Sequence, residues 1–137
     1  MALDGGGGGG GPIGVGNSFT GSAQALELYG DYAAAYSGEV STNDNETTHL
    51  EFQTGNFIFV GSWRPDYYHN ASQDCQWTCY FNENKIQVIS LSATQTPAAT
   101  PADIVIPSYT LVKITAFNII DSTALLLGTN MTGRIYK

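Results

Sequence analysis

Residues 76–91 read Gln-Trp-Thr-Cys-Tyr-Phe-Asn-Glu-Asn-Lys-Ile-Gln-Val-Ile-Ser-Leu, and they predict a β-hairpin. Aromatic side chains, which are enriched in strands, dominate the first run, Gln76–Phe81. Asn82-Glu83-Asn84 then turns the chain into Ile86–Leu91, where Ile86, Val88 and Ser90 lie on one face. This is the clearest hairpin in the sequence.

Short apolar runs separated by turn signals continue along the rest of the chain. In the run His49–Gln53, Leu50 and Phe52 alternate with polar residues and are expected to face the core. Further strand-like runs occupy residues 57–60, 103–106, 111–117, 124–129 and 133–136. About eight to ten short strands and one arguable helix predict an all-β fold, either an antiparallel β-sandwich or a jelly-roll-like small barrel.

Three segments carry expectations about connections. Thr54-Gly55-Asn56 predicts a hairpin turn into the run Phe57–Val60, which Gly61 closes. Thr94–Pro101 holds two prolines and predicts an exposed crossing loop. Ala25–Tyr36 fits either a helix or two strands joined at Gly30-Asp31, and the two strands are favoured.

The first 21 residues differ from the rest, because Gly5 to Gly11 are seven consecutive glycines. Glycine loses much conformational freedom on ordering and brings no side chain to bury, so an isolated glycine arm is expected to be a flexible coil. We therefore predict an arm over residues 1–21 and a single β-sandwich domain over residues 22–137. Gly5, Gly6, Gly7, Gly8, Gly9, Gly10, Gly11, Pro12 and Ile13 are the candidate assembly arm, to be ordered by neighbouring chains.

Composition limits the partners. The chain has 137 residues, the size of one domain, and a net charge of −7. It has five Lys and Arg residues in total, which argues against nucleic acid as a partner. Met1–Asp4 lack the features of a secretory signal, and the longest wholly apolar stretch, Tyr32–Tyr36, is far shorter than the roughly 20 residues of a membrane-spanning helix, so neither export nor a membrane partner is expected.

Cys75 and Cys79 are spaced as Cys-x-x-x-Cys. On an extended strand their Cα atoms lie roughly 13 Å apart, which is beyond the reach of a disulfide. Two buried reduced thiols are favoured, while a local disulfide at a turn and metal ligation remain alternatives.

Catalytic and cofactor motifs do not emerge. The glycine run lacks the Gly-Lys-Ser/Thr of a phosphate loop, and there is no Gly-x-Ser-x-Gly elbow. His49 and His69, taken with Asp66, Asp74 or Cys75, match no closed metal-site spacing. We expect no enzyme activity, no metal and no cofactor.

Aromatic residues concentrate around a polar loop between residues 63 and 80. The candidate contact residues are Trp63, Tyr67, Tyr68, His69 and Trp77. Flat rings beside amides and carboxylates suit a subunit contact or a glycan. The alternative is that Trp77 and Tyr80 are core residues and the loop is solvated.

A resemblance adds to this interpretation. The stretch Asp103–Thr115, the ending Thr132-Gly133-Arg134-Ile135-Tyr136 and the segment Leu50–Gly55 resemble small virion structural proteins of tailed bacteriophages, particularly marine ones. Ser108 and Lys137 depart from that pattern, which has a second proline and a terminal glycine there.

The resemblance implies a decoration, cement or other capsid-associated subunit without catalytic residues. It would be located in the virion, assembled in the host cytoplasm, and have other capsid subunits and copies of itself as partners. A phage receptor- or glycan-binding module is the alternative. The residues themselves add that Arg134 and Tyr136 share a face, as a cation–aromatic pair within the fold or a contact with another subunit. Gly133 allows a bulge or a close backbone approach.

Overall fold

The computed structural model describes residues 26–67, 73–92 and 101–137, and these parts contain ten strands and no helix. The strands are β1 (Glu27–Tyr29), β2 (Tyr32–Tyr36), β3 (Val40–Thr42), β4 (Thr47–Gln53), β5 (Ile58–Tyr67), β6 (Cys75–Phe81), β7 (Asn84–Leu91), β8 (Ala102–Ile106), β9 (Leu111–Asn118) and β10 (Leu125–Tyr136). The predicted glycine arm, the boundary near Gly21 and most of the predicted loop Thr94–Pro101 lie outside the described residues.

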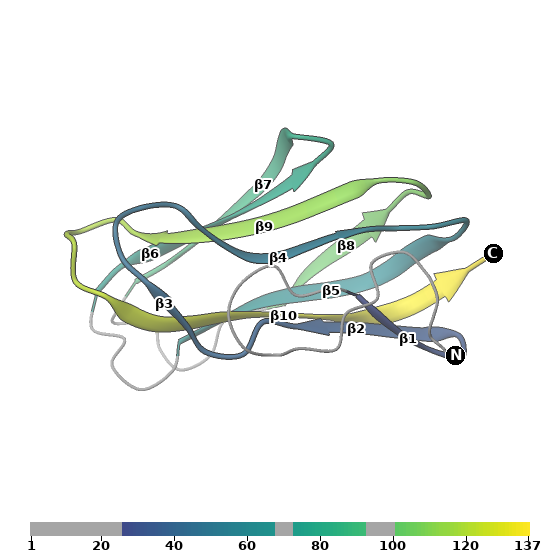
Figure 1. The fold of residues 1–137 in the computed structure, drawn as a ribbon, viewed down its shortest axis with the longest axis horizontal. Helices are drawn as coiled ribbons and strands as arrows, with labels where there is room; N and C mark the ends of the chain where they lie inside the picture. Colours follow the sequence, from purple (N-terminus) through teal and green to yellow (C-terminus); the bar gives the residue numbers. More distant parts are fainter. Residues whose placement is uncertain (1–25, 68–72, 93–100) are drawn as a thin grey trace.

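The strands form two antiparallel sheets that pack face to face, which confirms the predicted all-β sandwich. The first sheet has the order β1-β2-β10-β5-β8, and β3 also pairs with β10. The second sheet has the order β4-β9-β6-β7. Figure 1 shows the two layers, with β4 and β9 above β2 and β10.

The pairing is nested along the chain. β6 pairs with its neighbour β7, β5 pairs with β8, β4 pairs with β9, and β2 pairs with β10. Each pair encloses the previous one in sequence. The strands from the two ends of the described chain therefore meet in one sheet.

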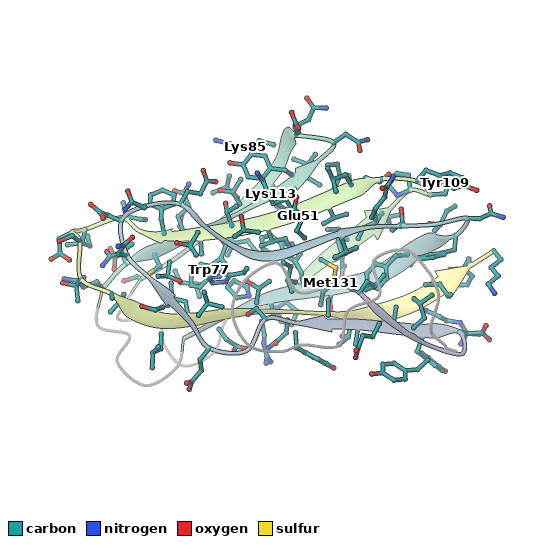
Figure 2. The ribbon with its side chains drawn as sticks, in the orientation of Figure 1. Glu51, Trp77, Lys85, Tyr109, Lys113 and Met131 are labelled. Carbon is teal, nitrogen blue, oxygen red and sulfur yellow. The ribbon has the colours of Figure 1, made fainter. Side chains whose placement is uncertain are left out.

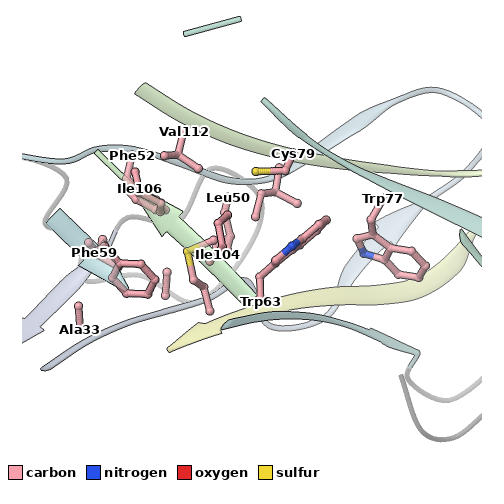
Figure 3. Close-up of a cluster of buried hydrophobic side chains, with 14 of the residues drawn as sticks. Ala33, Leu50, Phe52, Phe59, Trp63, Trp77, Cys79, Ile104, Ile106 and Val112 are labelled. Carbon is pink, nitrogen blue, oxygen red and sulfur yellow. The ribbon is translucent and has the colours of Figure 1, made fainter. Parts of the chain in front are cut away.

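Alternation of side chains along the strands creates one core between the sheets. Phe59, Trp63 and Trp77 are its largest members and are distributed along its length (Figure 3). Leu50 and Phe52 belong to this core, as the sequence predicted. Burying a side chain of this size contributes roughly 1.5 to 3 kcal/mol.

Two predicted hairpins are confirmed. β1 and β2 pair around Gly30-Asp31, so Ala25–Tyr36 supplies strands rather than a helix. β6 and β7 are joined by Asn82 and Glu83, whose φ angles of 49° and 69° give the type of two-residue turn that matches the twist of antiparallel strands.

The predicted hairpin at Thr54-Gly55-Asn56 is wrong. β4 belongs to the second sheet and β5 to the first, so this segment crosses between the layers. Thr54 holds the crossing by hydrogen bonds to the β8–β9 connection: its hydroxyl donates to the carbonyl of Pro107 at 2.7 Å and accepts from the amide of Thr110 at 2.9 Å.

Gly61 does not close a strand, because β5 continues to Tyr67. Gly61 pairs with Gly133 of β10, and the ring of Phe59 lies close to both backbones. An added Cβ on Gly133 would lie 2.6 Å from the Cα of Gly61 and 2.7 Å from the Phe59 ring. The prediction of a close approach at Gly133 is confirmed.

Candidate functional site

The two tryptophans of the predicted contact loop lie in the core, and both are 0% exposed. The Trp63 indole donates to the side-chain oxygen of Gln87 at 3.3 Å, and the Trp77 indole donates to the carbonyl of Gly128 at 3.1 Å. Figure 2 places Trp77 between the layers. The prediction that these indoles contact a partner is therefore wrong, because both rings are needed to fill the space between the sheets.

The structure does not describe the side chains of the other predicted contact residues. Tyr68 and His69 lie outside the described residues, as do the arm residues Gly5–Gly11, Pro12 and Ile13. Tyr67 ends β5, and its backbone pairs with Leu127. The structure thus leaves these positions as predictions and directs attention to a different surface.

That surface is the outer face of the first sheet. Because side chains in paired positions point to the same side of a sheet, register shows which residues are neighbours. One row crosses five of the six strands of this sheet, and we call it the tyrosine row: Tyr29, Tyr32, Arg134, Val60 and Val105. Tyr29, Tyr32 and Val105 are about 60% exposed, at 62%, 59% and 58%.

Arg134 packs against two tyrosines of this face, Tyr32 of the tyrosine row and Tyr136. Its guanidinium carbon lies 5.3 Å from the centre of the Tyr32 ring and 5.8 Å from that of Tyr136. It also donates to the Tyr32 hydroxyl at 3.3 Å and lies 3.7 Å from the carboxylate of Asp31. The predicted intrachain pair of Arg134 and Tyr136 is confirmed, and these contacts hold the rings in place although they are exposed.

Next to the tyrosine row the side chains are small. Ala34, Thr132 and Ser62 are paired across β2, β10 and β5, and we call them the floor row. Glu27 of β1 pairs with Ala34 and Asp103 of β8 pairs with Ser62, so a carboxylate lies at each end of the floor row. Beyond them, Tyr36, Asn130 and Arg64 form a third row of larger side chains. Two open hollows of about 480 and 500 Å³ meet at Val60 and Thr132. Together they make a shallow groove that runs across the strands.

The electrostatics of the face are mild. The Tyr29 hydroxyl donates to Glu27 at 2.6 Å, and this hydrogen bond raises the pKa of Tyr29 by favouring the protonated phenol. Arg64 is 3.4 Å from Asp66. The face therefore combines exposed rings with paired charges.

The outer face of the second sheet is different. The hydroxyls of Tyr80 and Thr115 both donate to the carboxylate of Glu46, and Lys113 lies 5.5 Å from the centre of the Tyr80 ring. The hydrogen bonds from Thr115 and Tyr80 lower the pKa of Glu46. Figure 2 shows Lys85 and Lys113 on the upper layer, away from the first sheet.

The described thiol groups are buried and do not belong to a cluster of reactive side chains. Cys75 and Cys79 are buried thiols in β6 that form no disulfide, as the favoured prediction had it. Burial raises the pKa of Cys79 to about 12. Within the described ranges, no three His, Cys, Asp or Glu side chains gather closely enough to hold a metal ion.

Sequence reasoning missed the tyrosine row. The alternation of Tyr32, Ala34 and Tyr36 indicates a strand, but both of its faces are apolar, so the pattern does not tell which one faces solvent. The two faces of this strand differ in side-chain size. The small Ala33 and Ala35 are buried, and the tyrosines are exposed. The partners on β5, β8 and β10 depend on long-range register, which no local pattern contains.

Comparisons with known proteins add no relative. No family model matches the chain, and neither do any curated protein or solved structure. In the described part of the chain no helix is long and apolar enough to cross a membrane.

Proposed function

We propose that this chain is a virion structural protein, a capsid decoration or cement subunit or another capsid-associated subunit, which stabilises a particle through contacts between subunits. Its partners are other capsid subunits and copies of itself in the virion, with the glycine arm ordered by neighbouring chains. The proposal assigns neither catalysis nor a cofactor. It also specifies the sandwich as a jelly roll.

The nested pairing supports the jelly roll. In that fold a long antiparallel hairpin of eight strands wraps into two sheets, so that the first strand pairs with the last and the middle two with each other. The pairs β2·β10, β4·β9, β5·β8 and β6·β7 follow this order. Jelly rolls include capsid domains, but they also include lectins and cupins, so the fold alone does not decide the function.

The observation that carries the proposal is the tyrosine row. Soluble monomers rarely expose large contiguous apolar patches, and interfaces between proteins are enriched in Tyr and Arg. Here Tyr29, Tyr32 and Arg134 are neighbours on β1, β2 and β10, and two valines continue the row on β5 and β8. Arg134 packs against the Tyr32 ring. Because the chain has few charged residues, little free energy is needed to remove charges from water when copies pack together.

The glycan-binding alternative has lost its strongest residues, because Trp63 and Trp77 are buried. No described residue of that loop now favours it. It remains an outcome to be tested rather than a second proposal.

Sedimentation velocity and negative-stain microscopy test the proposal on the full-length chain. We expect the wild type to form oligomers or particles, and the double variant Tyr29→Ser/Tyr32→Ser to self-associate at least tenfold more weakly. Ile86→Ser is the matched control, because Ile86 is also exposed but belongs to the second sheet.

Equal association of all three proteins would contradict a role for the tyrosine row. A wild type that remains a monomer at every concentration would contradict self-assembly. Saturable binding to immobilised glycans that is lost in Tyr68→Ala, with assembly unaffected, would favour the alternative.

A further inference from the structure

The groove of the first sheet has the dimensions of an extended peptide. Its floor row, Ala34, Thr132 and Ser62, lies between the tyrosine row and the row of Tyr36, Asn130 and Arg64. The tyrosine row crosses five strands at a spacing of about 4.8 Å, so this wall is about 19 Å long. The floor row crosses the three inner strands, and Glu27 and Asp103 lie at its two ends. Rows on the same face of a strand are about 6.6 Å apart, so the two walls are separated by roughly 13 Å.

We propose that this groove binds the glycine segment Gly5–Gly11 of a neighbouring copy of the chain. The exchange rests on the proposed assembly function, since a second copy must be adjacent. The assembly arm then has a defined receptor surface instead of a general contact with its neighbours.

Length supports this occupant. Seven residues in an extended or polyproline-like conformation, at about 3.1 Å each, span about 22 Å, which matches the length of the tyrosine row. Aromatic-lined grooves are an established way to bind such backbone conformations. Pro12 directly follows the glycines and favours the same conformation.

The chemistry of the groove also suits bare backbone. Glycine presents N–H and C=O groups with no side chain in front of them, and its Cα packs closely against a flat ring. The floor and walls offer hydroxyl groups from Thr132 and Ser62 and a guanidinium from Arg134. A segment with larger side chains would have to sit above the floor row and lose these contacts.

The first described residues lie beside the groove. The described residues start at Leu26, and the next residue, Glu27, pairs with Ala34 of the floor row. Residues 12–25 can span about 45 Å at roughly 3.3 Å per residue, more than twice the groove length. The glycines of one copy can therefore reach the groove of an adjacent copy.

Cysteine cross-linking between two full-length chains tests the docking. One chain carries Gly8→Cys and a tag that changes its mass, and the other carries Ala34→Cys. The native thiols do not compete, because Cys75 and Cys79 are buried. Under mild oxidation we expect a disulfide-linked pair of tagged and untagged chains, at a yield at least tenfold above the pair Gly8→Cys with Ser90→Cys.

Ser90 is the matched control because it is exposed on the second sheet. Equal yields for Ala34→Cys and Ser90→Cys would overturn the proposal. So would a chain with both Gly8→Cys and Ala34→Cys that links only within itself, because the groove would then hold the chain's own arm.

A blocked groove separates this inference from the assembly function. Ala34→Trp places a large side chain on the floor row, and Ser90→Trp is its control; circular dichroism checks that both fold. We expect Ala34→Trp alone to weaken self-association at least tenfold. If the wild type assembles, Tyr29→Ser/Tyr32→Ser disrupts assembly and Ala34→Trp does not, the docking is wrong and the proposed function stands. If the wild type is a monomer and no cross-link forms between chains, the docking and the self-assembly are both wrong.

Discussion

His49 is the only buried titratable side chain in the described residues that bridges the two sheets through both ring nitrogens. Nε2 lies 3.0 Å from the hydroxyl of Thr42, and Nδ1 lies 2.9 Å from that of Thr129. The Thr42 hydroxyl donates its proton to the carbonyl of Val40, so it accepts from Nε2–H. Nδ1 then accepts from Thr129, and the ring is held in one neutral tautomer.

A register shift explains how a histidine came to be buried here. Thr48 pairs with Thr115 and Leu50 with Ile114, so His49 is an extra residue in β4. Such a bulge lets two consecutive side chains face the core. The alternating pattern of residues 49–53 predicted Leu50 and Phe52 inside but gave no sign of the bulge.

This geometry predicts loss of stability in mild acid. Burial lowers the pKa of His49 from 6.5 to about 4, so the unfolded chain takes up a proton at a higher pH than the folded one. The contribution of His49 is complete above pH 6.5 and is lost as pH falls towards 4, by at most about 3 kcal/mol, at roughly 1.4 kcal/mol per pK unit. Urea unfolding between pH 7 and 4.5 measures it.

His49→Gln is the control, because Gln can hydrogen-bond to threonine without titrating. Glu46 and Asp121, whose pKa values are lowered by hydrogen bonds, contribute equally to both proteins. Parallel pH curves for the wild type and the variant would show that His49 does not cause the acid sensitivity.

At the scale of elements, local sequence signals predicted where strands end better than they predicted which sheet the next strand joins. The β6–β7 hairpin and the β1–β2 hairpin were predicted because each turn lies between two runs that pair with each other. Thr54-Gly55-Asn56 carries the same kind of signal, yet the chain crosses to the other sheet. In a sandwich, a turn signal shows that a strand ends and not which layer the next strand joins.

Strand lengths were also underestimated where glycine faces glycine. Gly61 was predicted to close a strand, and residues 130–132 were left between two predicted runs. β5 and β10 continue through these positions, and Gly61 pairs with Gly133. The short segment β3, Val40–Thr42, was not among the predicted strands, since its polar residues form a strand only by pairing with β10. The tyrosine row failed to emerge for the same reason: its members come from five separate strands.

The close approach of β5 and β10 predicts a large effect of a small substitution. An added Cβ in Gly133→Ala would meet the carbonyl of Val60 at 2.4 Å and the backbone of Gly61 at 2.6 Å, which neither strand can relieve without separating. We expect a loss of about 1 to 3 kcal/mol or more in the free energy of unfolding, measured by chemical denaturation.

Thr132→Ala is the neighbouring control, because Thr132 is exposed on the outer face of the same strand and its truncation removes no core contact. A Gly133→Ala protein as stable as that control would mean that β5 and β10 do not approach as closely as described.

For the whole molecule, the two buried thiols make global unfolding measurable. Cys75 and Cys79 both belong to the one core cluster, so no local opening at the surface exposes them. We expect labelling by a thiol reagent in native buffer to be slow, with both cysteines reacting at the same rate, and to give the same free energy as urea unfolding. Mass spectrometry with time follows the two labels.

The fully unfolded chain in urea supplies the reference rate for each thiol. Fast labelling of one cysteine alone in native buffer would show that β6 opens separately from the rest of the sandwich.

The nested order of strands also has a consequence for biosynthesis. β10 is the last described strand to leave the ribosome, yet it lies in the centre of the first sheet between β2 and β5. Until β10 emerges, β2 and β5 of a nascent chain each have an edge without its hydrogen-bonding partner, and such edges are prone to aggregation. Pairing between strands so far apart in the sequence is also slow, because closing long loops is entropically costly. The yield of folded protein in a cell is therefore governed by how the incomplete chain is protected during translation, as well as by the stability of the finished sandwich.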